Sequence, residues 1–96
     1  MMRAKDFLTT ANSILEERGR EYDRPGGERS MPATCTAFNA ITGKNLTPAE
    51  GYLFLQIVKD VRQWSRPGIH LDSAIDAISY AALKSEALME SADKKS

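Results

Sequence analysis

Leu46-Thr47-Pro48-Ala49-Glu50 is the strongest signal for the start of a helix in this chain. A threonine at the N-cap accepts a backbone hydrogen bond, and a glutamate three residues later returns one, which is the capping-box pattern. Proline is tolerated at the first helical position between them. We therefore expect a helix from residue 48 to about residue 65, ended by Arg66-Pro67-Gly68.

The apolar residues of this helix cover more than one narrow stripe. They are Leu53, Phe54, Leu55, Ile57, Val58, Val61 and Trp64. This breadth is typical of a central helix, or of a helix that also faces a second chain.

Three further segments carry apolar residues at helical spacing. The first covers residues 5–21, with Asp6 in its first turn. The second is capped by Ser30 and ends near Gly43, a residue suited to the left-handed position after a helix. The last begins near Leu71 or Asp72 and runs to about residue 91, with residues 91–96 expected to fray. We predict one all-α domain over residues 1–96, a compact bundle of four helices.

Size and composition limit the partners of this domain. A chain of 96 residues buries roughly two-thirds of its unfolded surface, so a homo-oligomer is the expected state. Thirteen basic and thirteen acidic residues cancel, which argues against nucleic acid as a partner. One cysteine, Cys35, and one histidine, His70, exclude an intrachain disulfide and a tetrahedral zinc site within one chain. The sequence contains no membrane-spanning run and no secretory signal pattern, so we expect a cytoplasmic protein.

A charged, glycine-containing stretch separates the first two predicted helices: Arg20-Glu21-Tyr22-Asp23-Arg24-Pro25-Gly26-Gly27-Glu28-Arg29-Ser30-Met31. Two glycines before a helix start offer free backbone N–H groups to an anion. The arginines suit phosphate, and the tyrosine suits stacking on a base. The alternative is that these arginines pair with the acids of the same stretch. The predicted ligand-binding residues are Arg20, Tyr22, Arg24, Gly26, Gly27, Arg29, Ser30, Asn39, Lys59, Arg62 and Tyr80.

Three carboxylates could form a Mg²⁺ site for a diphosphate substrate: Glu50, Asp72 and Asp76. Each also has a structural role open to it. Glu50 and Asp72 could act only as helix caps, and Asp76 could pair with Lys59 or Arg62. Structural roles are likewise open to Tyr80 in core packing and to Asn39 in a cap or turn.

The chain resembles a family of small phage and prophage proteins of unknown function, most specifically in its Gly-Glu-Arg-Ser-Met block. The resemblance covers nearly the whole chain and implies phage origin, a host-cytoplasmic location and an all-α fold. The residues that carry it are Glu17 to Asp23, Pro25 to Met31, Ala37 to Ala40, Thr42, Gly43, Leu46, Thr47, Gly51, Phe54, Lys59, Arg62, Asp72, Asp76, Tyr80 and Ala81.

The chain is also distantly similar to the all-α nucleotide pyrophosphohydrolases of the MazG and dimeric dUTPase type. Those enzymes hold Mg²⁺ with acids spaced by three on each of two helices. Here Glu50 is followed by Leu53 and Phe54 where a second acid would stand, and Asp72 and Asp76 are spaced by four. The resemblance implies a similar scaffold and a nucleotide-sized pocket, with an incomplete metal site.

Three hypotheses follow. The leading one is a phage accessory protein that binds a nucleotide or another anionic small molecule without a cofactor, and so sequesters a host signalling nucleotide as an anti-defence function. The second is a Mg²⁺-dependent nucleoside triphosphate pyrophosphohydrolase. The third is a protein-interaction module that inhibits a host protein through an exposed helical face.

Overall fold

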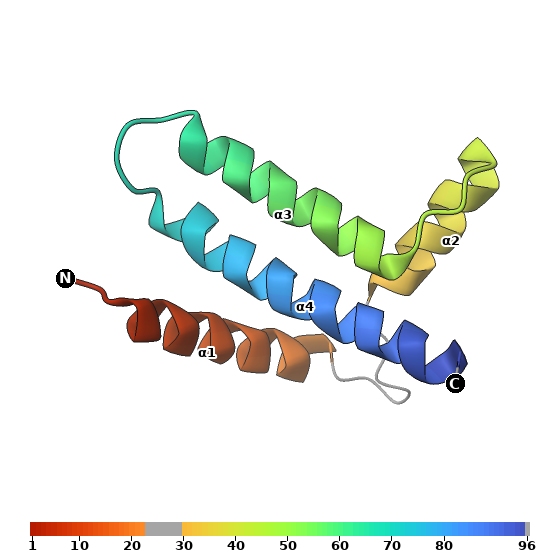
Figure 1. Cartoon of the computed structure of the whole chain (residues 1–96), viewed down its shortest axis with the longest axis horizontal. Coiled ribbons are helices and arrows are strands. Elements are labelled where there is room, and N and C mark those ends of the chain that lie inside the picture. Colours follow the sequence, from red (N-terminus) through yellow and green to blue (C-terminus); the bar gives the residue numbers. More distant parts are fainter. Residues whose placement is uncertain (23–29, 96) are drawn as a thin grey trace.

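The computed structural model describes the backbone of residues 1–22 and 30–95, and the side chains of residues 1–19 and 30–93. Within these ranges the chain forms four helices and no strand: α1 (Ala4–Tyr22), α2 (Ser30–Thr42), α3 (Pro48–Trp64) and α4 (Leu71–Lys95) (Figure 1). The predicted all-α fold of four packed helices is confirmed. The last helix continues past residue 91, where we expected its end, to Lys95.

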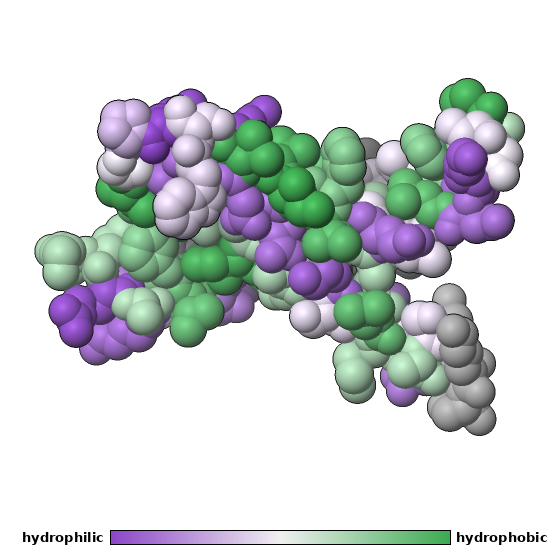
Figure 2. All heavy atoms as spheres, turned by 45° about the horizontal axis from the view of Figure 1, so that its top comes forward, coloured by the Kyte–Doolittle hydropathy of each residue, from purple (hydrophilic) through white to green (hydrophobic). Residues whose placement is uncertain are grey.

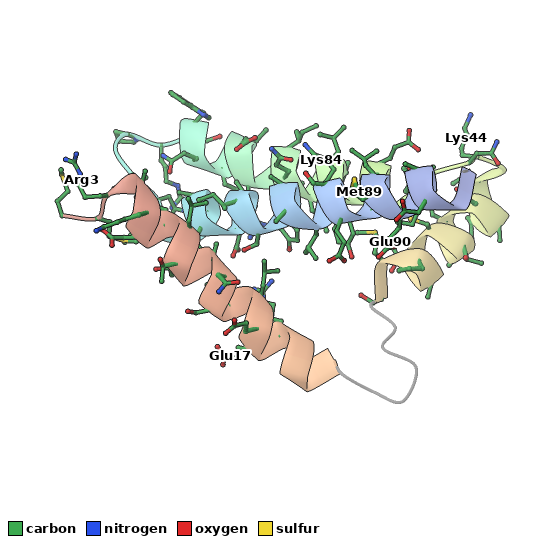
Figure 3. All side chains as sticks on the ribbon, turned by 60° about the horizontal axis from the view of Figure 1, so that its bottom comes forward. Arg3, Glu17, Lys44, Lys84, Met89 and Glu90 are labelled. Atoms are coloured by element: carbon green, nitrogen blue, oxygen red, sulfur yellow. The ribbon has the colours of Figure 1, made fainter. Side chains whose placement is uncertain are left out.

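The helices pack in the order α1, α4, α3, α2. The most extensive packing is between α3 and α4, which form an antiparallel hairpin, while α1 lies on the other side of α4 (Figure 1). Figure 3 shows α1 close to α4 at its start and separated from it at its end, near Glu17. Among the described helices, α2 packs only against α3. This order leaves much of the surface of α3 uncovered.

The predicted helix signals around α3 are confirmed in detail. The Glu50 N–H donates to Thr47 Oγ1 at 3.2 Å, and the Thr47 N–H donates to Glu50 Oε1 at 2.9 Å. At the end of α2, Gly43 adopts a φ of 72°, and its N–H donates to the Asn39 carbonyl oxygen at 2.9 Å. These caps fix the short connection between α2 and α3.

The described side chains form a small core. The buried apolar residues among them are Ala11, Cys35, Tyr52 and Ile75, joined by the buried serines Ser73 and Ser79. Gly51 lies where α2 meets α3, and a Cβ at this position would overlap with the sulfur of Met31. The absence of a side chain at Gly51 therefore allows the start of α3 to pack closely on α2.

Candidate functional site

The inward side of α3 carries polar residues beside buried Tyr52 and half-buried Leu55 and Val58. Lys59 Nζ lies 3.0 Å from Asp76 Oδ2, and Lys84 Nζ donates to Gln56 Oε1 at 3.0 Å. One turn further on, Gln63 Nε2 donates to the Gly68 carbonyl oxygen at 2.7 Å, and its Oε1 accepts from the His70 N–H at 2.8 Å. Gln56, Lys59 and Gln63 share one side of the helix because they are three and four residues apart. This side therefore packs against α4 and the turn that precedes it.

The opposite side of α3 is apolar and exposed. It consists of Phe54, Ile57, Val61 and Trp64, which we call the apolar stripe; these residues are 66%, 49%, 59% and 87% exposed. Their spacing of three, four and three residues places them along one face of the helix. Figure 2 shows a hydrophobic patch over the middle of α3. Leu53, at the edge of the stripe, is also exposed.

A surface helix usually turns its apolar side to the core and its polar side to water, whereas α3 presents a second apolar side, the apolar stripe, to water. The chain is also more extended than a compact monomer. Its radius of gyration is 14.9 Å, whereas about 12.5 Å is typical at this length. Large exposed apolar patches on soluble proteins mark interaction surfaces. The apolar stripe is therefore the candidate functional site.

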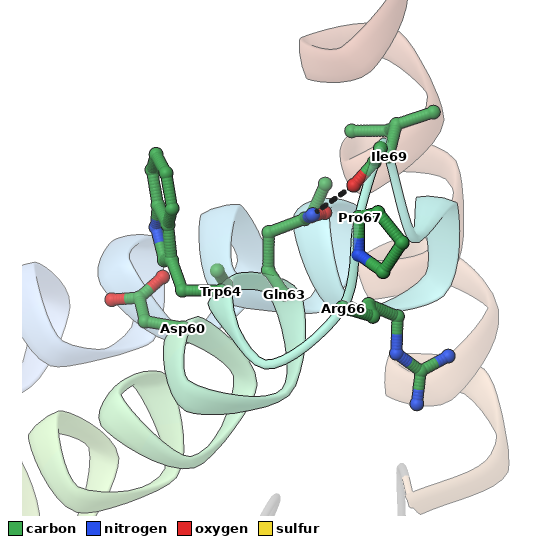
Figure 4. A pocket seen from close by; sticks show the side chains of 9 residues that line it. Asp60, Gln63, Trp64, Arg66, Pro67 and Ile69 are labelled. Carbon is green, nitrogen blue, oxygen red and sulfur yellow. Dashed lines mark hydrogen bonds between the residues drawn. The ribbon is translucent and has the colours of Figure 1, made fainter.

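A cavity of about 640 Å³ adjoins the C-terminal end of the apolar stripe. It lies between the end of α3, the following turn and the first turns of α4. In Figure 4 Trp64 and Asp60 stand side by side on one wall, while the Gln63 side chain reaches across to the turn that carries Pro67 and Ile69. The cavity is lined by Asp60, Gln63, Trp64, Arg66, Pro67, Gly68, Ile69, Ala74 and Ala77.

Most of the predicted anion-binding loop lies outside the described residues. This holds for Arg24, Gly26, Gly27 and Arg29, and for the side chains of Arg20 and Tyr22. Ser30 is described as the exposed first residue of α2, and its carbonyl oxygen accepts a hydrogen bond from Thr34 Oγ1 at 2.9 Å. The nucleotide-binding hypothesis therefore stays a prediction.

The other predicted ligand-binding residues lie in separate places. Asn39 closes the α2–α3 connection: its Oδ1 accepts from the Leu46 N–H at 2.7 Å, and its Nδ2 donates to the Leu46 carbonyl oxygen at 3.0 Å. This is the turn role that the sequence left open. Lys59 pairs with Asp76, also an open alternative, whereas Arg62 is exposed on α3 and Tyr80 is half-buried on α4.

The three predicted Mg²⁺ ligands occupy different sites. Glu50 belongs to the capping box of α3, Asp72 is exposed in the first turn of α4, and Asp76 is paired with Lys59. Among the side chains of residues 1–19 and 30–93, no group of three His, Cys, Asp or Glu could hold a metal ion. In the described part of the chain, Glu50 thus serves a helix cap and Asp76 an ion pair, and the expected carboxylate cluster is not formed.

The cap and the core each shift the pKa of one group. Hydrogen bonds from the Thr47 backbone and then from its side chain hold the pKa of the Glu50 carboxyl below its ordinary value. Burial, assisted by the negative charge of Glu50, raises the pKa of the Cys35 thiol. The carboxylate at Glu50 is therefore favoured as a cap, and the thiol at Cys35 is kept protonated.

Sequence reasoning missed the residues that close the α3–α4 turn. Beyond the contacts of Gln63, His70 Nδ1 lies 2.6 Å from Ser73 Oγ, at the start of α4. Gly68, with a φ of 76°, was a usable signal because it indicates a tight turn just before a helix start. The apolar stripe itself was visible as the wide apolar surface of residues 53–64, but nothing local indicated which part of it would face water.

Comparisons with protein-family models, with curated proteins and with solved structures gave no match to this chain. The resemblances to phage proteins and to MazG-type enzymes therefore stay predictions. In the described residues, no helix is long and apolar enough to cross a membrane.

Proposed function

We propose that this protein is a helical protein-interaction module whose docking surface is the apolar stripe of α3. One observation carries the proposal: the four large apolar side chains of the apolar stripe lie exposed along one side of α3, away from the side that contacts α4 and the turn. A partner that covers the apolar stripe would restore the usual relation between apolar surface and water.

The exposed area is of the size that a protein interface uses. If a fully exposed large apolar side chain presents about 150–250 Å², the apolar stripe exposes roughly 500 Å². Covering this area contributes about 12 kcal/mol at roughly 25 cal/mol per Å². Association costs about 4–15 kcal/mol in lost freedom, so a useful affinity needs the flanking residues as well. Leu53 is exposed beside the stripe, and Ile69 is exposed in the lining of the cavity. Both residues can add apolar area to the interface.

This proposal develops the third hypothesis from the sequence. The interaction surface is supported by the orientation of α3, while inhibition of a host protein stays a prediction. The nucleotide-binding hypothesis depends on residues 20–29, and the pyrophosphohydrolase hypothesis depends on a carboxylate cluster. Both stay predictions that need separate experiments.

A photoreactive side chain tests the docking surface directly. We would place p-benzoylphenylalanine at Phe54 and, as a matched control, at Leu8 on α1, because these side chains are 66% and 62% exposed. Irradiation in cells should give discrete protein adducts at position 54 and none at position 8. Equal labelling at both positions, or no adduct at position 54, would refute the proposed docking surface.

A further inference from the structure

We infer that the apolar stripe is covered by a second copy of this chain, with the two α3 helices packed antiparallel. This inference rests on the proposed docking surface and names its occupant. Phe54, Ile57, Val61 and Trp64 occupy alternating three- and four-residue steps, which is the a and d spacing of a two-helix seam. A seam of this kind is self-complementary when two identical helices pair about a two-fold axis.

Antiparallel pairing matches side chains of unequal size across the axis. Counting outward from the middle of the stripe, Ile57 of one copy lies opposite Val61 of the other. In the outer layers Phe54 lies opposite Trp64. A parallel pair would place each of these residues opposite itself, with two tryptophans in a single layer at one end.

Charges at the two ends of α3 also favour the antiparallel arrangement. Glu50 is exposed in the first turn of α3, and Arg66 is exposed just after its last residue. Glu50 lies about nine residues before the middle of the stripe and Arg66 about seven residues after it. An antiparallel pair therefore places Glu50 of each copy near Arg66 of the other. A parallel pair would bring Glu50 next to Glu50 and Arg66 next to Arg66, which is repulsive. Antiparallel helices also align their dipoles favourably.

The cavity at the end of α3 provides space for the outer layer. Trp64 forms part of its wall, and Ile69, Ala74 and Ala77 give it apolar lining. With Phe54 of the second copy opposite Trp64, the phenyl ring lies at the mouth of this cavity. The two-fold axis repeats this contact, so each copy places its Phe54 ring at the cavity of the other.

The surface of the isolated chain indicates that a large area is left to cover. The chain exposes 7316 Å² for a mass of 10.6 kDa, whereas a folded monomer of that mass typically exposes about 5500 Å². A standard interface buries about 800 Å² on each partner. The apolar stripe supplies roughly 500 Å² of this area, so the flanking residues must supply the rest, and a small core gains from such an interface.

Thiol crosslinking of two cysteine variants tests whether a second copy covers the stripe and whether the two α3 helices run antiparallel. Leu53 and Asp60 lie on one edge of the stripe. In the antiparallel pair the two-fold axis passes level with residue 59, so Asp60 of one copy lies opposite Asp60 of the other, whereas the two Leu53 positions are about 18 Å apart along the helices. We would make Leu53→Cys and Asp60→Cys as separate chains in a Cys35→Ala background that leaves the stripe intact. A short thiol crosslinker should join two Asp60→Cys chains in several-fold excess over two Leu53→Cys chains, whereas a parallel pair would place both positions level with their copies.

A Leu8→Cys chain serves as the control for random collision, and circular dichroism confirms that each variant is helical. Linkage of the Leu53→Cys chains that equals or exceeds that of the Asp60→Cys chains, or no linkage above the Leu8→Cys control, would overturn the inference. Sedimentation of the unsubstituted chain as a monomer at every concentration would overturn it as well. If position 54 captures a different protein in the photocrosslinking experiment while these variants fail to link, the docking surface stands and the second copy is excluded.

Discussion

Replacement of Lys59 by methionine removes one half of the ion pair that orients α3 on α4. Lys59 Nζ lies 3.0 Å from Asp76 Oδ2, and the two side chains are only 18% and 17% exposed. The substitution keeps the alkyl volume but leaves the Asp76 carboxylate without this partner in a mostly dry position. Loss of one partner from a fully buried pair costs about 3–5 kcal/mol, and an exposed pair contributes at most about 1 kcal/mol. For this partly exposed pair we expect a loss of about 2 kcal/mol.

Urea unfolding followed by circular dichroism measures this loss, at several protein concentrations because dimer formation would couple to stability. The double variant Lys59→Met with Asp76→Leu should recover most of it, since a well-packed apolar pair often replaces a buried ion pair at little cost. Arg62→Met is the matched control, because it removes the same charge from an exposed position on α3 and should change stability by less than about 0.5 kcal/mol. If Lys59→Met is no more destabilising than Arg62→Met, the pair does not fix the orientation of α3.

Three further predictions concern the cap, the thiol and the loop. Because the folded state lowers the pKa of Glu50, its contribution to stability is present above the ordinary glutamate pKa and is lost as the pH falls through the lowered value. The difference in urea stability between the wild type and Glu50→Gln should therefore shrink in acid, and a difference that grows would contradict the role of the Thr47 hydrogen bonds. Burial and a raised pKa should make Cys35 react much more slowly with a thiol reagent in the folded chain than in urea, since the thiolate is the reactive form; equal rates would show that the thiol is accessible. If residues 20–31 bind a nucleotide, a thermal-shift panel should find a stabilising nucleotide whose effect Arg29→Ala abolishes, and no shift with any nucleotide would remove that hypothesis.

The helix ends could be predicted because their signals are local. The capping box of Thr47 and Glu50 and the left-handed Gly43 depend only on residues within one turn of each cap. Local hydrogen bonds of this kind compete with few alternatives, so residue type and spacing are enough to identify them. Asn39 is different: from the sequence, a turn role was only one of two alternatives for it, because its contacts are less local. Its partner Leu46 is seven residues away, across the α2–α3 connection.

The orientation of α3 could not be predicted from the sequence, for a physical reason. Apolar residues cover several sides of this helix, so periodicity alone selects no inward face. On the inward face Lys59 pairs with Asp76 and Gln56 with Lys84, and both pairs join residues far apart in the chain. The same long-range pairing engages Asp76, which sequence reasoning offered as a metal ligand. Such partners become visible only once two helices are placed side by side.

The concentration dependence of the molar mass, measured by sedimentation equilibrium, tests most directly whether a second copy covers the apolar stripe. The wild-type chain should approach twice its mass of 10.6 kDa as the concentration rises. Val61→Glu, which places a charge in the middle of the stripe, should sediment as a helical monomer. The matched variant Leu8→Glu, on the exposed surface of α1, should remain a dimer. A wild-type chain that stays monomeric throughout, or a Val61→Glu variant that dimerises as well as Leu8→Glu, would contradict the account.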